Sequence, residues 1–408
     1  MGAIDSLMPN SALQHRTVRT LASAQVLSGV GVAGTVAAGS LLVSSITDSE
    51  TLAGLAQTSA VLGAAALALP LARLTGRGGR RYALSVGYTA GAIGSLFAIL
   101  GGSLSNIFLM LIGTFMVGAA SAAGYQARFA AIDLSTDQTR AKQLSFVVWG
   151  STIGAVTGPN LMQPAGNLAE NFGLPRLVGP YVISAVTLTL ATVVIFLFLK
   201  PDPFLVANKE SVTQREKGAT KKALTHIRNN PKALFAILSI AIGHVAMVSV
   251  MVMTPVHMAH VDVTLTIIGL VISIHVLGMY AFSPIVGSLS DRFGRVRVIQ
   301  IGIVTLLVST IISGFSRADD AYTLGLGLFL LGLGWSCTLI AGSAFLSESV
   351  DPTFKASSQG ASDLVMNLAG AGGGALAGVI IGTLSYGWLC FFAAIPVLAL
   401  GLRSLKLR

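Results

Sequence analysis

The chain has 408 residues, of which 53% are hydrophobic and only 10% are charged, and its mean hydropathy is +0.78. Soluble domains carry far more charge, so this composition excludes a soluble enzyme and indicates a membrane protein. The formal net charge is +10, which in a soluble protein would suggest a nucleic-acid partner.

Apolar stretches near the ~20 residues that a helix needs to cross a bilayer recur along the whole chain. We therefore predict an all-α membrane protein. The twelve predicted transmembrane helices are residues 20–44, 51–72, 82–102, 106–131, 143–165, 177–199, 233–257, 264–286, 298–315, 321–344, 360–382 and 387–402. The chain starts with a polar segment and a full-length span, which differs from a cleavable secretory signal.

The basic residues are distributed unevenly between the predicted loops. If both termini are cytoplasmic, 23 of the 26 Lys and Arg residues lie in the cytoplasm, two lie outside and one, Arg128, lies within a span. This follows the positive-inside rule and fixes the predicted orientation. The net charge thus reflects topology, and we expect no nucleic-acid partner. The expected partners are the lipid bilayer and a small substrate, and the expected state is a monomer.

The longest polar stretch, residues 200–232, divides the spans into two sets of six. It predicts a cytoplasmic linker between two helical bundles. The predicted divisions are an N-terminal cytoplasmic segment 1–17, a first bundle 18–199, the linker 200–232, a second bundle 233–402 and a cytoplasmic tail 403–408.

The two halves share local sequence patterns. The glycine-arginine loop 76–81 after the second span matches residues 291–296 after the eighth. A Gly-x-x-x-x-Gly pattern at 113–118 in the fourth span matches 327–332 in the tenth at nearly the same offset. Two such matches indicate a parallel repeat of six spans, and transporters built from repeats place their substrate site between them near the membrane midplane.

The second-half loop reads Gly287-Ser-Leu-Ser-Asp291-Arg292-Phe-Gly294-Arg295, which resembles the signature loop of the major facilitator superfamily. The resemblance implies a transporter that works by alternating access, with Asp291, Arg292, Gly294 and Arg295 as a conformational latch. It places Asp291 against the start of the fifth span, where a helix N-terminus favours negative charge. In the first-half copy Gly76 occupies the aspartate position, so we expect an asymmetric latch.

Histidine and methionine gather in one window of the second half. Residues 244–279 contain four of the six histidines and five of the eleven methionines. The pairs Met247/Met251 in the seventh span and His275/Met279 in the eighth have helical spacing and comparable membrane depth. Thioether and imidazole groups bind monovalent copper well, so these four predict a copper site. Auxiliary metal contacts are expected from His244, and outside the membrane from His257, Met258 and His260.

The Met-x-x-x-Met and His-x-x-x-Met motifs in these two spans are similar to those of the CcoA-like copper-uptake transporters, a bacterial branch of the superfamily. The resemblance implies copper import across the bacterial cytoplasmic (inner) membrane, for the assembly of haem–copper oxidases. It also implies that Met247, Met251, His275 and Met279 bind the transported ion. Copper is then the substrate, and no permanently bound cofactor is expected.

Arg128 is an intramembrane charge that needs a partner or a wet cavity. It either binds an anionic substrate group or braces the latch through Asp133 or Asp363; its position toward the cytoplasm favours bracing. For the methionines the alternative interpretation is packing, because flexible thioethers fill gaps between helices.

Two other interpretations of the chain remain. The glycines at 150, 154 and 158 of the fifth span resemble the motif of proton-coupled exporters of small organic compounds, although close helix packing explains them as well. A metal sensor without transport explains the histidine and methionine cluster but lacks an appended signalling domain. An enzyme is not expected, since no phosphate-binding loop or nucleophile pattern occurs.

Overall fold

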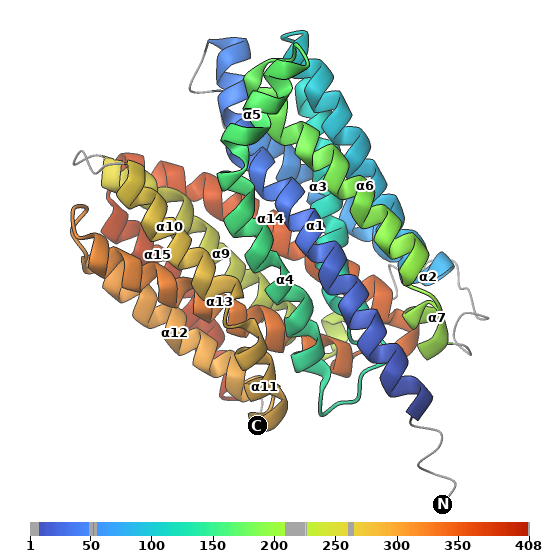
Figure 1. The fold of residues 1–408 in the computed structure, drawn as a ribbon. Coiled ribbons are helices and arrows are strands. Elements are labelled where there is room, and N and C mark those ends of the chain that lie inside the picture. Colours follow the sequence, from blue (N-terminus) through green and yellow to red (C-terminus); the bar gives the residue numbers. More distant parts are fainter. Residues whose placement is uncertain are drawn as a thin grey trace, which may run out of the picture. The chain divides into compact units, whose positions relative to one another are not determined.

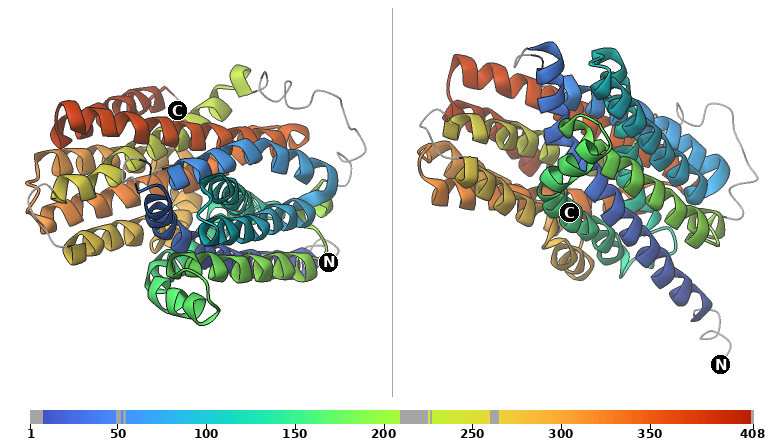
Figure 2. Two further views of the ribbon diagram at one scale, coloured as in Figure 1. Left: turned by 90° about the horizontal axis from the view of Figure 1, so that it is seen from above. Right: turned by 45° about the horizontal axis from the view of Figure 1, so that its top comes forward.

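The computed structural model describes residues 8–48, 52, 55–208, 225, 227–259 and 265–406, and within these ranges the chain is helical and contains no strand (Figures 1 and 2). The helices are α1 (Met8–Thr47), α2 (Leu55–Ser103), α3 (Ile107–Ala130), α4 (Arg140–Asn160), α5 (Met162–Asn171), α6 (Gly179–Phe198), α7 (Pro203–Ala207), α9 (Pro231–Ala259), α10 (Leu265–Tyr280), α11 (Ser283–Phe293), α12 (Arg295–Phe315), α13 (Ala321–Ser349), α14 (Lys355–Thr383) and α15 (Tyr386–Ser404), with short 3-10 turns at Arg176–Val178 and Pro352–Phe354.

Ten helical segments of the described chain are long and apolar enough to cross a membrane. The exposed side chains agree with this. On α12, Ile301, Val304, Val308 and Ile311 are all exposed and follow the three- and four-residue spacing of one helical face. An apolar stripe of this length facing outward is expected of a helix in contact with lipid.

The predicted second and third spans form one continuous element. Helix α2 runs over 49 residues and changes direction at Gly79, whose backbone has φ 85° and ψ 176°. That combination is essentially restricted to glycine. Gly79 therefore lets two helices meet without the loop that the sequence predicted between residues 72 and 82.

Proline divides two of the predicted spans. The fifth, predicted at 143–165, is divided between α4 and α5, and the eighth, at 264–286, between α10 and α11. Pro164 and Pro284 follow these breaks. A proline has no N–H for the carbonyl four residues earlier and its ring crowds that carbonyl, so each helix is interrupted one turn before it.

Two predicted boundaries also shift. Helix α1 begins at Met8, inside the predicted N-terminal segment 1–17, and α9 begins at Pro231, just inside the predicted linker 200–232. The linker contains the short helix α7, capped by the Asp202 carboxylate at the N–H groups of Phe204 and Leu205. Much of the remaining linker, 209–224 and residue 226, lies outside the described residues.

The chain forms two compact units. The first contains residues 1–135, 146–221 and 352–364, and the second contains 136–145, 222–351 and 365–408. Each unit thus takes one short segment from the other half of the sequence. In the first unit α2 packs against α3 and α6, and α1 packs against α6. In the second, α13 packs against α9, α10 and α12, and α15 packs against α9 and α12 (Figure 1).

The glycines of the fifth predicted span serve close packing in the first unit. The backbone of Gly154 lies directly against that of Gly29 on α1, and Gly158 lies against Ala33 and Gly34. A side chain larger than hydrogen at Gly154 would meet main-chain atoms. The small-residue spacing therefore brings α4 against α1, which is the packing interpretation of this motif.

Candidate functional site

The four residues of the predicted copper site lie in the second unit, on α9 and α10. Met247, His275 and Met279 are buried, and Met251 is half-buried. The predicted site requires α9 and α10 to bring their ligands to one point, but both helices pack mainly against α13 and make little direct contact with each other. The joint copper site remains a prediction.

His275 has a setting that suits a metal ligand. Its Nδ1 lies 2.7 Å from the main-chain oxygen of Leu328 on α13. A carbonyl only accepts hydrogen bonds, so the neutral ring carries its proton on Nδ1 and a lone pair on Nε2. The buried Nε2 has no hydrogen-bond partner within the described ranges. Metal-binding histidines commonly donate their second N–H to a backbone carbonyl in this way.

His244 lies in an aromatic cluster. Its Nδ1 accepts a hydrogen bond of 3.1 Å from Trp335 Nε1 on α13, and Tyr280 meets the Trp335 ring edge-on with centroids 5.6 Å apart. Gly370 on α14 lies so close to the His244 ring that a Cβ there would crowd it. Sequence analysis assigned His244 an auxiliary metal role and missed its neighbours. An indole inside an apolar span, which needs an acceptor when buried, was the available signal.

The outer end of α9 is organised by a second ring pair. His257 stacks on Tyr386 with centroids 4.3 Å apart and an interplanar angle of 9°, and the Tyr386 hydroxyl lies 2.8 Å from Thr254 Oγ1. Met258 is fully buried, whereas the predicted auxiliary residue His260 lies outside the described residues. No group of three His, Cys, Asp or Glu side chains suited to a metal occurs among the residues that the structure describes.

The second-half glycine loop, between α11 and α12, contacts the start of α4. The Asp291 carboxylate accepts hydrogen bonds from the main-chain N–H groups of Ala141 at 2.9 Å and Lys142 at 2.8 Å. These N–H groups belong to the first turn of α4 and have no partner within the helix. The carboxylate therefore satisfies them and meets the positive end of the helix dipole.

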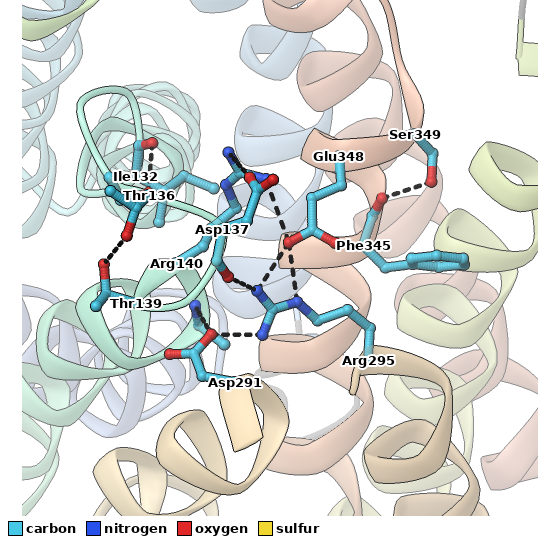
Figure 3. Close-up of polar contacts among 12 residues, drawn as sticks. Ile132, Thr136, Asp137, Thr139, Arg140, Asp291, Arg295, Phe345, Glu348 and Ser349 are labelled. Carbon is cyan, nitrogen blue, oxygen red and sulfur yellow. Dashed lines mark hydrogen bonds and ion pairs between the residues drawn. The ribbon is translucent and has the colours of Figure 1, made fainter. Parts of the chain in front are cut away.

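Arg295 joins this loop to α13 (Figure 3). Its guanidinium pairs with Asp291, and it donates to Glu348 Oε1 at 2.8 Å and to the Asp137 main-chain oxygen at 2.6 Å. Glu348 also pairs with Arg140 at 3.2 Å. Of the other predicted latch residues, Gly294 turns the chain with φ 94°; Arg292 lies over the Phe293 ring.

The first unit contains a buried charge network at the end of α3. Arg128 pairs with Asp363 of α14 at 2.6 Å, and the two side chains are 3% and 1% exposed. Arg80, next to the α2 kink, donates to Asp133 at 2.8 Å and 3.2 Å. Gln126 connects the pairs, since it accepts from Arg80 at 3.0 Å and donates to Asp363 at 2.6 Å. Asp133 and Asp363 were the two partners considered for Arg128, and the structure pairs Arg128 with Asp363.

Long apolar helices in two compact units define a multi-pass helical membrane protein. The sequence matches the family model of the Major Facilitator Superfamily over residues 21–261 and 245–407. The chain belongs to this superfamily of transporters, which are not enzymes.

Similar proteins from bacteria extend over nearly the whole chain. The uncharacterized MFS-type transporter YdeG of Bacillus subtilis is 36% identical over 385 residues, which cover 94% of this chain and 90% of YdeG. YddS of the same organism is 32% identical, covering 98% and 92%. The riboflavin transporter RfnT of Brucella anthropi is 27% identical, covering 98% of each chain.

Solved structures share the fold. The E. coli fucose:proton symporter FucP superimposes with a TM-score of 0.74 at 15% identity and covers 95% of this chain and 98% of its own. The human organic anion transporter MFSD10 gives a TM-score of 0.76 at 15% identity, with coverage of 96% and 99%. At this identity the likeness is one of fold alone.

Proposed function

We propose that the chain is a secondary active transporter for a flat, heteroaromatic organic solute, with twelve spans and both termini in the cytoplasm of a bacterial cell. The count of twelve divides α2 at Gly79 and includes α4, which is not among the ten apolar segments. The positive-inside distribution of Lys and Arg supports the orientation and the cytoplasmic membrane as the location.

The observation that carries the substrate class is the His244–Trp335–Tyr280 cluster. It is formed by α9, α10 and α13, and its outer members His244 and Tyr280 are half-buried while Trp335 is buried between them. Aromatic faces with a few polar edges suit planar solutes. RfnT, which is similar to this chain over 98% of its length, gives riboflavin as the first compound to test.

The test uses the full-length protein in proteoliposomes loaded with unlabelled riboflavin. Exchange with labelled riboflavin outside requires neither a known direction nor a known driving force. At low substrate concentration we expect Trp335→Phe to exchange riboflavin more slowly than the wild type. This substitution keeps an aromatic ring but removes the donor to His244. Trp388→Phe is the matched control, because Trp388 is 51% exposed and lies on α15. No exchange by the wild type, or equal loss in both variants, contradicts the proposal.

Copper is the second candidate substrate, and one observation favours it. The lone pair on His275 Nε2 is buried without a hydrogen-bond partner in the described chain, which is the state a copper ligand requires. The named relatives do not support a copper branch. Elemental analysis of copper-starved cells decides the point: if wild type accumulates copper, and Met251→Leu and His275→Leu do not at equal expression, copper replaces the organic solute.

The exporter alternative shares the same class of substrate and differs in direction. The same proteoliposomes separate an importer from an exporter when a proton gradient is imposed. A proton-coupled importer moves riboflavin in the direction of proton flow, whereas a proton-coupled exporter moves it in the opposite direction.

A further inference from the structure

The twelve predicted spans contain one acidic and one basic side chain. Within the twelve predicted spans Asp363 is the single carboxylate, and Arg128 is the single Lys or Arg. The structure joins them at 2.6 Å, with both side chains almost completely buried. Charged groups buried inside a membrane protein are costly, and in transport proteins they mark ion pathways and proton relays.

The carboxylate is held on both oxygens from α3. Arg128 donates to Oδ1 and Gln126 donates to Oδ2, each at 2.6 Å. The Tyr125 and Phe129 rings cover the Arg128 guanidinium, with centroids 5.7 Å and 4.7 Å away. Asp363 thus lies in a confined site where its charge state determines whether Arg128 has an anionic partner there.

Three further groups complete the polar surroundings. Arg80 on α2 donates hydrogen bonds to Asp133 from two of its guanidinium nitrogens. It also donates to Gln359 Oε1 on α14 at 2.6 Å. The two arginines and two aspartates balance in charge when all four are ionised. Protonation of Asp363 leaves the network with one excess positive charge in a buried place, which weakens it.

A purely structural role does not require these charges. Buried ion pairs are often replaced by apolar residues of similar volume without loss of stability, since the cost of removing both charges from water offsets their attraction. A pair that can lose one charge reversibly does something that apolar residues cannot do. It lets residues 355–364 of α14 bind α2 and α3 strongly or weakly, depending on whether Asp363 carries a proton.

We propose that Asp363 is the binding site of a coupling proton, an assignment that rests on the proposed secondary transport. A proton from water adds to a carboxylate oxygen of Asp363 and forms an O–H bond, and the ion pair with Arg128 is lost. When the same O–H bond breaks, the proton returns to water on the other side of the membrane and the ion pair forms again. Nothing is oxidised or reduced, and no other reactant is needed.

The direct test is infrared difference spectroscopy of the full-length protein in liposomes, titrated from alkaline to acidic pH without substrate. We expect the C=O band of a protonated buried carboxyl group to appear in wild type as pH falls, and to be lost in Asp363→Asn. Asp133→Asn is the matched control, because Asp133 is a buried carboxylate that also pairs with an arginine. No band in wild type, or a band lost in Asp133→Asn but kept in Asp363→Asn, overturns the proposal.

The double variant Asp363→Asn/Arg128→Gln guards against loss of folding, since it removes both charges together. In proteoliposomes it should lose accumulation driven by a proton gradient while riboflavin exchange continues in reduced form. Accumulation equal to wild type overturns the proton site. If wild type does not exchange riboflavin, the proposed substrate fails, while the infrared titration still decides whether Asp363 binds the proton. His244, His257 and His275, the histidines within the predicted spans, are unchanged in both variants. They are the alternative proton sites if gradient-driven accumulation persists.

Discussion

The two glycine loops of the predicted repeat have similar sequences and different partners. In the second-half loop Asp291 caps the first turn of α4, and Arg295 binds Glu348 at a partly exposed site. In the first-half loop the aspartate is replaced by Gly76, and a Cβ built there meets nothing within 4 Å. The main-chain N–H of Arg81 instead donates to Asp202, at the start of the linker, at 2.7 Å.

The arginines of the two loops differ even more. Arg80 is fully buried and connects α2, α3 and α14 through Asp133, Gln126 and Gln359, whereas Glu348, the partner of Arg295 on α13, is 24% exposed. A surface cap is worth roughly 1 kcal/mol, but a buried charge left without its partner costs several times more. The repeat thus keeps its loop geometry while one half depends on capping and the other on a buried network.

The largest expected effect comes from Arg80→Leu. Asp133 would then remain buried without its guanidinium, and the free energy of unfolding should fall by about 3–5 kcal/mol. Arg295→Leu should cost less, about 1–3 kcal/mol, because Glu348 can turn to water. Both are measured by circular dichroism during unfolding of the full-length protein in detergent. Equal losses in the two variants would show that burial does not separate the two loops.

The next comparison is between Gly79→Ala and Gly294→Ala. Both glycines have positive φ, at 85° and 94°, so an added Cβ costs similar backbone strain of about 1–3 kcal/mol in each. At Gly79 the Cβ also meets the Asp202 carboxylate, whereas at Gly294 it meets nothing within 4 Å. We expect Gly79→Ala to lower the unfolding temperature further. Equal shifts in the two variants would mean that Asp202 moves aside without cost, and the reverse order would contradict the expected role of this contact.

Sequence patterns predicted the helical membrane class, and the family match confirms the superfamily membership that was inferred from the signature loop. They did not predict where helices end, because these ends depend on single residues in context. Pro164 and Pro284 interrupt spans whose hydropathy is continuous, while Gly79 joins two spans that a polar loop was expected to separate.

The candidate site was predictable only in part. The charges of Arg128 and Asp363 stand out in apolar sequence, and their pairing could be considered because each needs a partner. The neighbours of His244 were not predictable, because Tyr280 and Trp335 come from other helices and their register depends on packing. Spacing placed Met247 and His275 at similar depth, but it could not show that α13 packs against both of their helices.

A smaller effect is expected for Asp291→Asn, which keeps the size of the side chain and removes its charge. The two N–H groups of α4 then lose a charged acceptor, and unfolding should be easier by about 1 kcal/mol. Unfolding of this unit can be followed with a thiol-reactive dye. Cys337 and Cys390 are buried in the folded protein, so the dye reacts with them only as they become exposed during heating. Ser288→Ala, at an exposed position of the same loop region, should leave the curve unchanged, and an equal shift there would exclude capping as the cause.

The smallest and most specific effect is expected from Gly76→Asp, which restores the missing acid. Gly360 packs on Ala72, four residues before Gly76, as Ser145 and Ala141 pack on Gly287, four residues before Asp291. By this correspondence the new carboxylate faces the N–H groups of Ala356 and Ser357 in the first turn of α14, which lack intrahelical partners. A carboxylate at a helix N-terminus contributes about 0.3–1 kcal/mol, so unfolding should become harder by that amount.

Gly76→Asn is the control for this gain, because it adds a side chain of nearly equal size without the charge. A gain in both variants would mean that any side chain fills the open space. A gain in neither would mean that the buried network already fixes the start of α14, and that Gly76 marks a half of the repeat in which the cap had become unnecessary. Because the cap holds residues 352–364 to α2 regardless of the charge on Asp363, Gly76→Asp should also slow gradient-driven transport in proteoliposomes more than Gly76→Asn does.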